Sequence, residues 1–233
     1  MTFKRPSGRK FDELREIDAK VGVVKRADGS AMFKIGKTVA VAAVYGPRNL
    51  HPKFLQNPKK GVLRCNYNMM AFSGSGERVR PGPSRRSKEI SMVTAKALEP
   101  VLDLSEYPST VVDIFIELIQ TDAGTRCAGI CAAAMALADA GLPMKDMVAA
   151  ISFGDVGDQL IIDLDKEEED FNGPVSDVPV AMTQRTKEIT LLQMDGQISE
   201  KKLEEGLKLA ERVLEKIFEV QKKALLERHG ADK

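Results

Sequence analysis

The chain has 233 residues, with 35 basic and 34 acidic side chains, so its formal net charge at pH 7 is only +1. Hydrophobic residues make up 43% and charged residues 30%, as in a soluble globular protein long enough for one large domain or two fused small ones. The balanced charge argues against a broad basic face for nucleic acid, although it allows a local basic channel. The lack of Trp and the 5% of aromatic residues argue against an aromatic platform for stacking bases.

The cysteines and the first residues indicate a cytoplasmic protein. The three cysteines are an odd number, and Met1–Lys10 carries charges but no apolar stretch of a secretory leader. No window approaches the roughly 18 apolar residues of a membrane span, so no membrane partner is expected. Cys127 and Cys131, four residues apart on a predicted helix, offer too few ligands for zinc and are expected to be buried.

The first half of the chain predicts an antiparallel meander. After an irregular or briefly helical start over residues 1–18, three runs of strand-forming residues are separated by turn pairs that contain glycine. The predicted strands are Ala19–Lys25, Ala31–Ile35 and Thr38–Tyr45, with Gly46 and Pro47 ending the last. A further strand is predicted over Val62–Phe72, where apolar and more polar residues alternate.

A loop, a helix and a strand follow, and then a helix of small residues. Residues 73–83 are rich in Gly, Ser and Pro and predict a mobile loop, after which Ser84 can cap a helix that runs to about Leu98. Val111–Ile119 alternates as a strand does. The helix predicted over Thr125–Ala140 is so rich in Ala that it is expected to be central and buried.

The second half predicts four strands and a long amphipathic helix that starts at Ser199. The strands are Val148–Phe153, Gln159–Leu164, Val178–Thr183 and Glu188–Gln193. Each half therefore reads as a sheet covered by helices, and no linker separates them. The sequence predicts a layered α/β fold in a single unit.

The segment Gln120–Arg126, between a buried strand and the small-residue helix, is a candidate anion site. Gly124 permits an unusual backbone angle, and a helix start presents free N–H groups and partial positive charge. Arg126 in the first turn opposes the helix dipole, a local cost that an anionic ligand would offset. The alternative is a plain loop in which Asp122 or Thr125 caps the helix.

Two further charged segments could carry chemistry. Arg85 and Arg86 open the helix after the loop, where they could grip phosphates through paired hydrogen bonds, or simply form a solvated basic face. The acidic run Asp163–Asp170, with Asp177 beyond it, could hold Mg²⁺ or donate a proton to a leaving oxygen. Glu167 and Glu168 within that run are expected to be solvated.

Three segments together resemble the RNase PH-type phosphorolytic exoribonucleases. Pro83–Ile90 resembles the arginine-bearing helix start of that family, Gln120–Arg126 its phosphate-binding turn, and Ile162–Asp170 with Ser176–Val180 its acidic strand and loop. The flanking segments are most similar to the catalytic ring subunits of the archaeal exosome. These flanks are Arg5–Arg9, Glu13–Arg15, Ala27–Ser30 and Tyr45–Arg48.

The resemblance implies a mixed α/β RNase PH-like fold, related to the second domain of ribosomal protein S5, with an internal duplication. Residues 1–233 would form a single domain with halves of about 1–145 and 146–233. It also implies 3′-to-5′ degradation of single-stranded RNA that uses inorganic phosphate, releases nucleoside diphosphates and can reverse to add tails. The expected assembly is a hexameric ring of three heterodimers with a related non-catalytic subunit, topped by RNA-binding cap proteins.

Roles carry over to single residues through the same motifs. Gly124, Thr125 and Arg126 would bind inorganic phosphate. The RNA would be held by Arg64, Arg85 and Arg86. Asp170 and Asp177 would be the catalytic carboxylates and could hold Mg²⁺.

One departure from the family pattern concerns the carboxylates. The interval from Asp170 to Asp177 is one residue longer than the family pattern, so Glu169 could take the first catalytic position instead. We favour Asp170, because the loop Asn172–Pro174 accommodates an extra residue more easily. The rival functions are a stand-alone homohexameric RNase PH that trims tRNA 3′ ends, a non-catalytic RNA-binding ring subunit, and a small-molecule phosphate enzyme.

Overall fold

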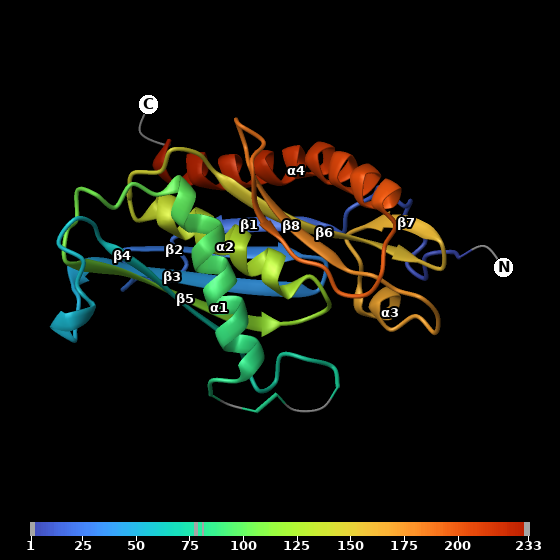
Figure 1. The fold of residues 1–233 in the computed structure, drawn as a ribbon, viewed down its shortest axis with the longest axis horizontal. Coiled ribbons are helices and arrows are strands. Elements are labelled where there is room, and N and C mark those ends of the chain that lie inside the picture. Colours follow the sequence, from blue (N-terminus) through green and yellow to red (C-terminus); the bar gives the residue numbers. More distant parts are fainter. Residues whose placement is uncertain (1–2, 77–78, 81, 231–233) are drawn as a thin grey trace.

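Two β-sheets contact a shared central helix in the computed structural model, which describes residues 3–76, 79–80 and 82–230. The five-stranded sheet has the order β1-β2-β3-β5-β4, and the four-stranded sheet has the order β7-β6-β8-β9. In Figure 1 the long helix α4 (Glu200–His229) runs along the top of the molecule, above the strands. These layers confirm the mixed α/β fold class that the sequence predicts.

The predicted meander forms one edge of the five-stranded sheet. Its strands β1 (Ile17–Val21), β2 (Gly29–Ile35) and β3 (Thr38–Asn49) pair antiparallel in sequence order. The prediction that Gly46 and Pro47 end the third strand is wrong, because β3 continues to Asn49. The pairing register shifts between Tyr45 and Arg48, so the strand passes the proline through an irregularity.

The other edge brings together strands that lie far apart in sequence. Strand β5 (Thr110–Gln120) pairs antiparallel with β3, and β4 (Val62–Met69) pairs parallel with β5 at the sheet edge. The crossover between them carries α1 (Arg85–Leu98), which Ser84 caps as predicted. The predicted loop over residues 73–83 forms no regular element where it is described, and residues 77, 78 and 81 lie outside the described residues.

Helix α2 (Thr125–Asp139) lies at the centre of the molecule. It packs against β2 and β3 of one sheet and against β6 of the other, and almost all its residues are buried, which confirms the prediction of a central helix. Small side chains allow this double contact. The same burial raises the pKa of the Cys131 thiol to about 12, so this cysteine remains a protonated thiol in the core.

The second half forms an antiparallel sheet beneath α4. Its strands are β6 (Val148–Val156), β7 (Gln159–Ile162), β8 (Val178–Thr183) and β9 (Ile189–Leu192). A one-turn helix that the sequence did not predict, α3 (Lys166–Glu169), follows β7. Two short 3₁₀ turns complete the elements at Lys53–Leu55 and Glu99–Val101.

One hydrophobic core runs through both sheets. It joins Ala31 and Ile116 of the first sheet to Ile151 and Val180 of the second through the residues of α2. Helix α4 closes it from outside by packing against β6 and β1. None of the helices among the described residues is both long and apolar enough to cross a membrane.

Gly206 of α4 gives a test of this packing. A Cβ atom added there would lie 2.2 Å from the ring of Phe153 on β6, so no side chain fits without movement. Gly→Ala normally favours a helix by about 1 kcal/mol. Here we expect Gly206→Ala to lower the free energy of unfolding by about 1–3 kcal/mol in a urea titration, because the core is overpacked.

The exposed neighbour Glu205 provides the control. Glu205→Ala should leave the free energy of unfolding within about 0.5 kcal/mol of the wild type. A Gly206→Ala chain as stable as the wild type would mean that α4 is not seated on Phe153 as described.

Candidate functional site

A pocket of about 440 Å³ opens where the starts of α1 and α2 meet α3 and the start of β8. Elements of both halves line it, so the fold brings together segments more than 90 residues apart. Its charged lining residues are Arg80, Arg86, Arg126, Lys166, Glu169 and Asp177. Four cationic and two anionic groups thus share one cavity, a composition suited to an anionic ligand.

The predicted phosphate turn forms one wall of this pocket, with Gly124, Thr125 and Arg126 all lining it. Gly124 is the N-cap of α2 in a left-handed conformation, with φ of 62°, and among the described residues no side chain caps the first turn. The alternative in which Asp122 or Thr125 caps the helix is therefore wrong. The helix start faces the pocket with its N–H groups uncapped by side chains, which is the arrangement that binds anions.

A buried threonine, Thr38, holds the backbone of this turn by two hydrogen bonds. The Thr38 hydroxyl donates to the carbonyl oxygen of Ala123 at 2.7 Å and accepts from the backbone N–H of Asp122 at 2.9 Å. Ala123 itself has φ of 58°, a conformation that is unfavourable for a residue with a side chain. The surrounding structure therefore fixes two consecutive left-handed residues before the helix begins.

The side chain of Arg126 is oriented by residues that the sequence did not single out. Its guanidinium donates to the amide oxygen of Gln193, just after β9, and lies 3.8 Å from the carboxylate of Glu89 on α1. Gln193 in turn donates to Glu89 at 2.7 Å. Residues from α1 and from the end of β9 therefore converge on Arg126, an orientation that local sequence could not reveal.

The three arginines predicted to hold RNA are placed differently from one another. Arg86 lines the pocket, whereas Arg85 is exposed on the first turn of α1 outside it. Arg64, on β4, also lies outside the pocket lining and forms a paired contact with Asp113 at 2.5 and 2.9 Å. This hydrogen-bonded contact raises the pKa of Arg64 further above its ordinary value. Arg80, in the loop before α1, joins Arg86 in the pocket.

Helix α3 decides which acidic side chains face the pocket. Asp165 and Glu168 form a reciprocal capping box, and Glu168 turns inward to meet Arg5 at 2.6 Å with both side chains fully buried. The expectation that Glu168 is solvated is therefore wrong, although Glu167 is exposed. Because α3 is a single turn, the neighbouring carboxyl of Glu169 points to the pocket instead.

The structure separates the two candidates for the first catalytic carboxylate. Glu169 is half-buried and lines the pocket, together with Asp177 at the start of β8. Asp170 is exposed, lies outside the pocket lining, and pairs with Lys166 at 2.6 Å. The structure thus brings Asp177 and Glu169 together, and leaves Asp170 on the outer side of α3.

Both pocket carboxyls are held in an environment that disfavours charge. Burial, reinforced by the negative charge of Asp177, raises the pKa of Glu169 to about 7. Burial also raises the pKa of Asp177, and Asp195 adds to the effect while Arg126 opposes it. One oxygen of Asp177, Oδ1, is buried and has no hydrogen-bond partner among the described residues.

Other pocket residues lacked any sequence signal for a site. Tyr67 of β4 and Ser152 of β6 fit the alternating pattern of their strands, so they looked like ordinary sheet residues. Within the described ranges, no group of three or more His, Cys, Asp or Glu side chains is arranged to hold a metal ion. A cation in the pocket would therefore need ligands beyond Glu169 and Asp177.

The paired carboxyls predict a pH-dependent effect on stability. The pKa of Glu169 lies above its ordinary value of 4.5, so the wild type loses stability as the pH rises from about 4.5 to about 7. Glu169→Gln removes that penalty. Discounted for partial exposure, the variant should gain about 1 kcal/mol of unfolding free energy at pH 8 and nothing at pH 4, by denaturant titration.

Asp170→Asn is the matched control, since it removes only the exposed contact with Lys166. It should change the free energy of unfolding by no more than about 0.5 kcal/mol at either pH. Equal stability of Glu169→Gln and wild type at pH 8 would show that the pocket does not disfavour a charged Glu169.

Known families and structures match the chain along its length. Residues 13–143 match domain 1 of the 3′ exoribonuclease family, and residues 146–213 match domain 2 of the same family. The chain is 50% identical over 226 residues to the exosome complex component Rrp41 of Pyrococcus furiosus, covering 97% of this chain and 89% of that protein. It is 48% identical over 228 residues to the Rrp41 of Methanopyrus kandleri, covering 98% and 94%.

Solved structures agree with the fold. The crystal structure of rice Rrp46 superposes with a TM-score of 0.83 at 24% identity, covering 95% of this chain and 99% of that one. A structure described as the Archaeoglobus fulgidus exosome with RNA bound to the active site gives 0.79 at 24% identity, covering 93% and 92%. Both parts of the family are therefore matched in order along one chain, and relatives about half identical span nearly its whole length. The chain belongs to the RNase PH family of 3′ exoribonucleases, as its motifs predicted.

Proposed function

We propose that the chain is the catalytic subunit of an exosome ring, which shortens RNA from its 3′ end with inorganic phosphate and releases nucleoside diphosphates. The observation that carries the proposal is the pocket in which the uncapped start of α2, with Arg126, shares one cavity with Arg86 and two carboxyls. The relatives named as exosome components support the same conclusion.

The pocket has room for two anions with different roles. Inorganic phosphate binds at Gly124, Thr125 and Arg126, where helix N–H groups and a guanidinium converge. The phosphate of the terminal RNA nucleotide lies toward Arg86 and Arg80, which also line the pocket. Since two anions must approach each other, the cations stabilise the encounter and orient both groups.

The reaction exchanges one bond to phosphorus for another. An oxygen of inorganic phosphate attacks the phosphorus that joins the last two nucleotides, and the bond from that phosphorus to the 3′ oxygen breaks. The terminal nucleotide leaves as a nucleoside diphosphate. The new 3′ oxygen of the shortened RNA takes a proton. A phosphoester is replaced by a phosphoanhydride, so the reaction runs backward at high nucleoside diphosphate and adds tails.

The proton comes from the carboxyl pair, and we assign the first position of that pair to Glu169 in place of Asp170. Glu169 lines the pocket and, with a pKa of about 7, is partly protonated near neutral pH, whereas Asp170 is exposed and paired with Lys166. When deprotonated, the carboxylates of Asp177 and Glu169 would also be hard oxygen ligands suited to Mg²⁺. Such an ion would neutralise charge on the reacting phosphates.

Arg85 and Arg64 serve the RNA outside the pocket. Arg85 is exposed beside Arg86 at the start of α1, so it can contact the backbone of an upstream nucleotide. Arg64 is half-exposed in its pair with Asp113, which leaves part of its guanidinium free for a phosphate. A strand that enters the pocket would pass these cations in turn.

The chain acts within an assembly in the cytoplasm. We propose a ring of three heterodimers with a related non-catalytic subunit and RNA-binding cap proteins, in which this chain is a single domain with two halves. The relatives named as exosome complex components support such an assembly. The continuous core across both sheets supports the single domain.

Phosphate dependence tests the proposed reaction. With 5′-labelled oligo(A), Mg²⁺ and the related ring subunit, the chain should release nucleoside diphosphate only when phosphate is present. Arg126→Ala should raise the phosphate KM by about 100-fold or more, as expected for a lost charge-assisted contact to the phosphate. Arg212→Ala on the exposed side of α4 should leave the KM unchanged.

Release of nucleoside monophosphate without phosphate would identify hydrolysis and refute the proposal. Absence of any release from the complex would instead support the non-catalytic ring subunit. An active homohexamer, recognised by the native mass of the chain alone, would support the stand-alone enzyme.

The carboxylate assignment predicts opposite fates for two neighbours. Glu169→Gln should lower kcat by about 100-fold or more, because the proton donor is lost, while Asp170→Asn should stay within about twofold. At saturating phosphate, the wild-type kcat should fall as the pH rises above about 7, where Glu169 loses its proton. If the Asp170→Asn variant is inactive and the Glu169→Gln variant is active, Asp170 is the proton donor and the assignment to Glu169 is wrong.

A further inference from the structure

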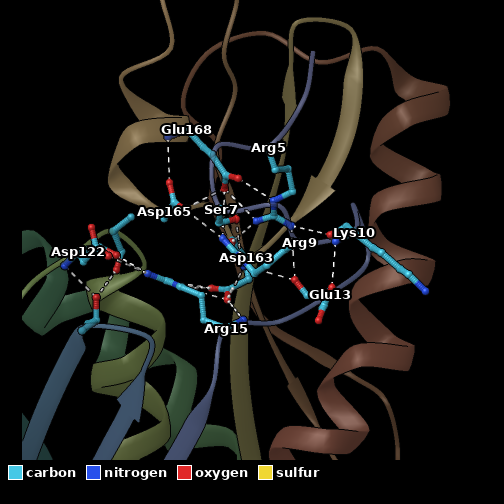
Figure 2. A network of polar contacts seen from close by, with 12 residues as sticks. Arg5, Ser7, Arg9, Lys10, Glu13, Arg15, Asp122, Asp163, Asp165 and Glu168 are labelled. Carbon is cyan, nitrogen blue, oxygen red and sulfur yellow. Dashed lines mark hydrogen bonds and ion pairs between the residues drawn. The ribbon is translucent and has the colours of Figure 1, made fainter. Parts of the chain in front are cut away.

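The segment before β1 connects two parts of the chain that line the pocket. These are the phosphate turn Gln120–Arg126 and the acidic segment that carries α3. Figure 2 shows Arg5, Arg9 and Arg15 of this segment gathered around Asp163 and Glu168, which lie just before and within α3. The segment, residues 3–16, has no regular secondary structure, and these ion pairs hold it together with the buried ring of Phe3 and a backbone hydrogen bond from the Ile162 N–H to the Phe11 carbonyl oxygen. Both members of the pairs Arg5–Glu168 and Arg15–Asp163 are almost completely buried.

Arg15 alone among these arginines reaches the phosphate turn. On one side, its guanidinium donates to both oxygens of Asp163, with distances of 2.7 to 3.1 Å, and its backbone N–H donates to the same carboxylate at 2.8 Å. On the other side, its Nη1 donates to the carbonyl oxygen of Asp122. That nitrogen also lies 4.0 Å from the Asp122 carboxylate. One side chain therefore spans from the acidic segment to the turn.

The turn is closely fitted to this side chain. A Cβ atom added at Gly124 would lie 3.1 Å from Nη2 of Arg15, so the guanidinium packs directly against the residue that caps α2. The hydroxyl of Thr38 holds Asp122 and Ala123 by two further hydrogen bonds. Thr38 and Arg15 thus both contact the turn that contains the left-handed residues Ala123 and Gly124.

The acidic segment that Arg15 binds continues into α3, which carries Glu169. Asp163 is buried with φ of 54°, and its backbone carbonyl accepts from Arg5 at 2.9 Å and from Arg9 at 3.1 Å. Two residues later Asp165 caps α3, and Arg5 fixes Glu168 inside that single turn. The direction of Glu169 into the pocket therefore depends on the same anchored segment.

We propose that Arg15 is a positioning residue that sets the distance between the phosphate turn and the proton-donating carboxyl of α3. The inference rests on the proposed function, because it assigns a purpose to the spacing within that site. Arg15 touches neither substrate and acts through Asp122 and Asp163. Its planar fork, which binds a carboxylate and a carbonyl in fixed directions, cannot be reproduced by the single ammonium of a lysine.

A buried ion pair of this kind is poorly explained by stability alone. Burying two charges costs solvation free energy that their attraction often only balances, and apolar replacements of similar size can be as stable. Because Arg15 contacts both Asp122 and Asp163, it fixes the geometry between two segments that lie 41 residues apart in sequence. Such geometry matters where two reacting groups must meet, because a misplacement of about 1 Å can cost about 100-fold in rate.

The test compares Arg15→Lys with the wild type in complex with the related ring subunit. The phosphate KM in the oligo(A) assay, and the Kd for inorganic phosphate by calorimetry, should both rise about tenfold or more, while the KM for RNA stays within about twofold. If Arg15→Lys fails to fold, Asp163→Asn keeps the shape of the partner and removes its charge. It should raise the same two constants.

The matched control is Arg228→Lys, which breaks an arginine pair with Asp139, a carboxylate as buried as Asp163. It should lower the melting temperature without changing either phosphate constant. If Arg15→Lys behaves in the same way, Arg15 is only structural and the inference is overturned. A wild type that releases no nucleoside diphosphate refutes the proposed function instead, and an unchanged phosphate Kd in Arg15→Lys would still overturn the inference by itself.

Discussion

The structure depends on how charges from the two halves of the chain are neutralised where they meet. Arg15 and Asp163, and beside them Arg5 and Glu168, form buried ion pairs that join the N-terminal segment to the strand end and helix of the second half. Removing one partner would leave an uncompensated charge in the interior, at a cost of about 3–5 kcal/mol. The two walls of the pocket are therefore coupled, and neither can shift without disturbing a buried charge.

The pocket contains charged groups in places where their charge is unfavourable. Arg126 lies in the first turn of α2, where the helix dipole disfavours a cation, and the start of that helix is uncapped by any side chain. Nearby, Oδ1 of Asp177 is buried without a hydrogen-bond partner among the described residues, and burial, reinforced by the charge of Asp177, raises the pKa of Glu169. An anion at the helix start and a proton on the carboxyl pair relieve both conflicts. In the proposed reaction, phosphate and RNA offset these unfavourable charge placements.

Sequence patterns predicted the long helices and strands of this fold better than the short turn α3 and the long-range contacts that position it. The alternation over β5 and the small residues of α2 reflect local burial, so both elements and the cap at Ser84 could be predicted. The single turn of α3 could not, because an acidic run looks solvated until Arg5 is known to bury Glu168. Loop length favours Asp170 as the first carboxylate, whereas the direction of the side chains in this turn favours Glu169, which lines the pocket.

The missing information is of one physical kind. Arg5 and Glu168 are 163 residues apart in sequence, and Gln193 reaches Arg126 across 67 residues, so no local period links either pair. A motif shows that an arginine or a carboxylate is present, whereas its protonation and direction depend on partners that only folding supplies. The same dependence makes the N-terminal segment part of the site, because residues that touch no substrate determine where the phosphate turn and Glu169 can face one another.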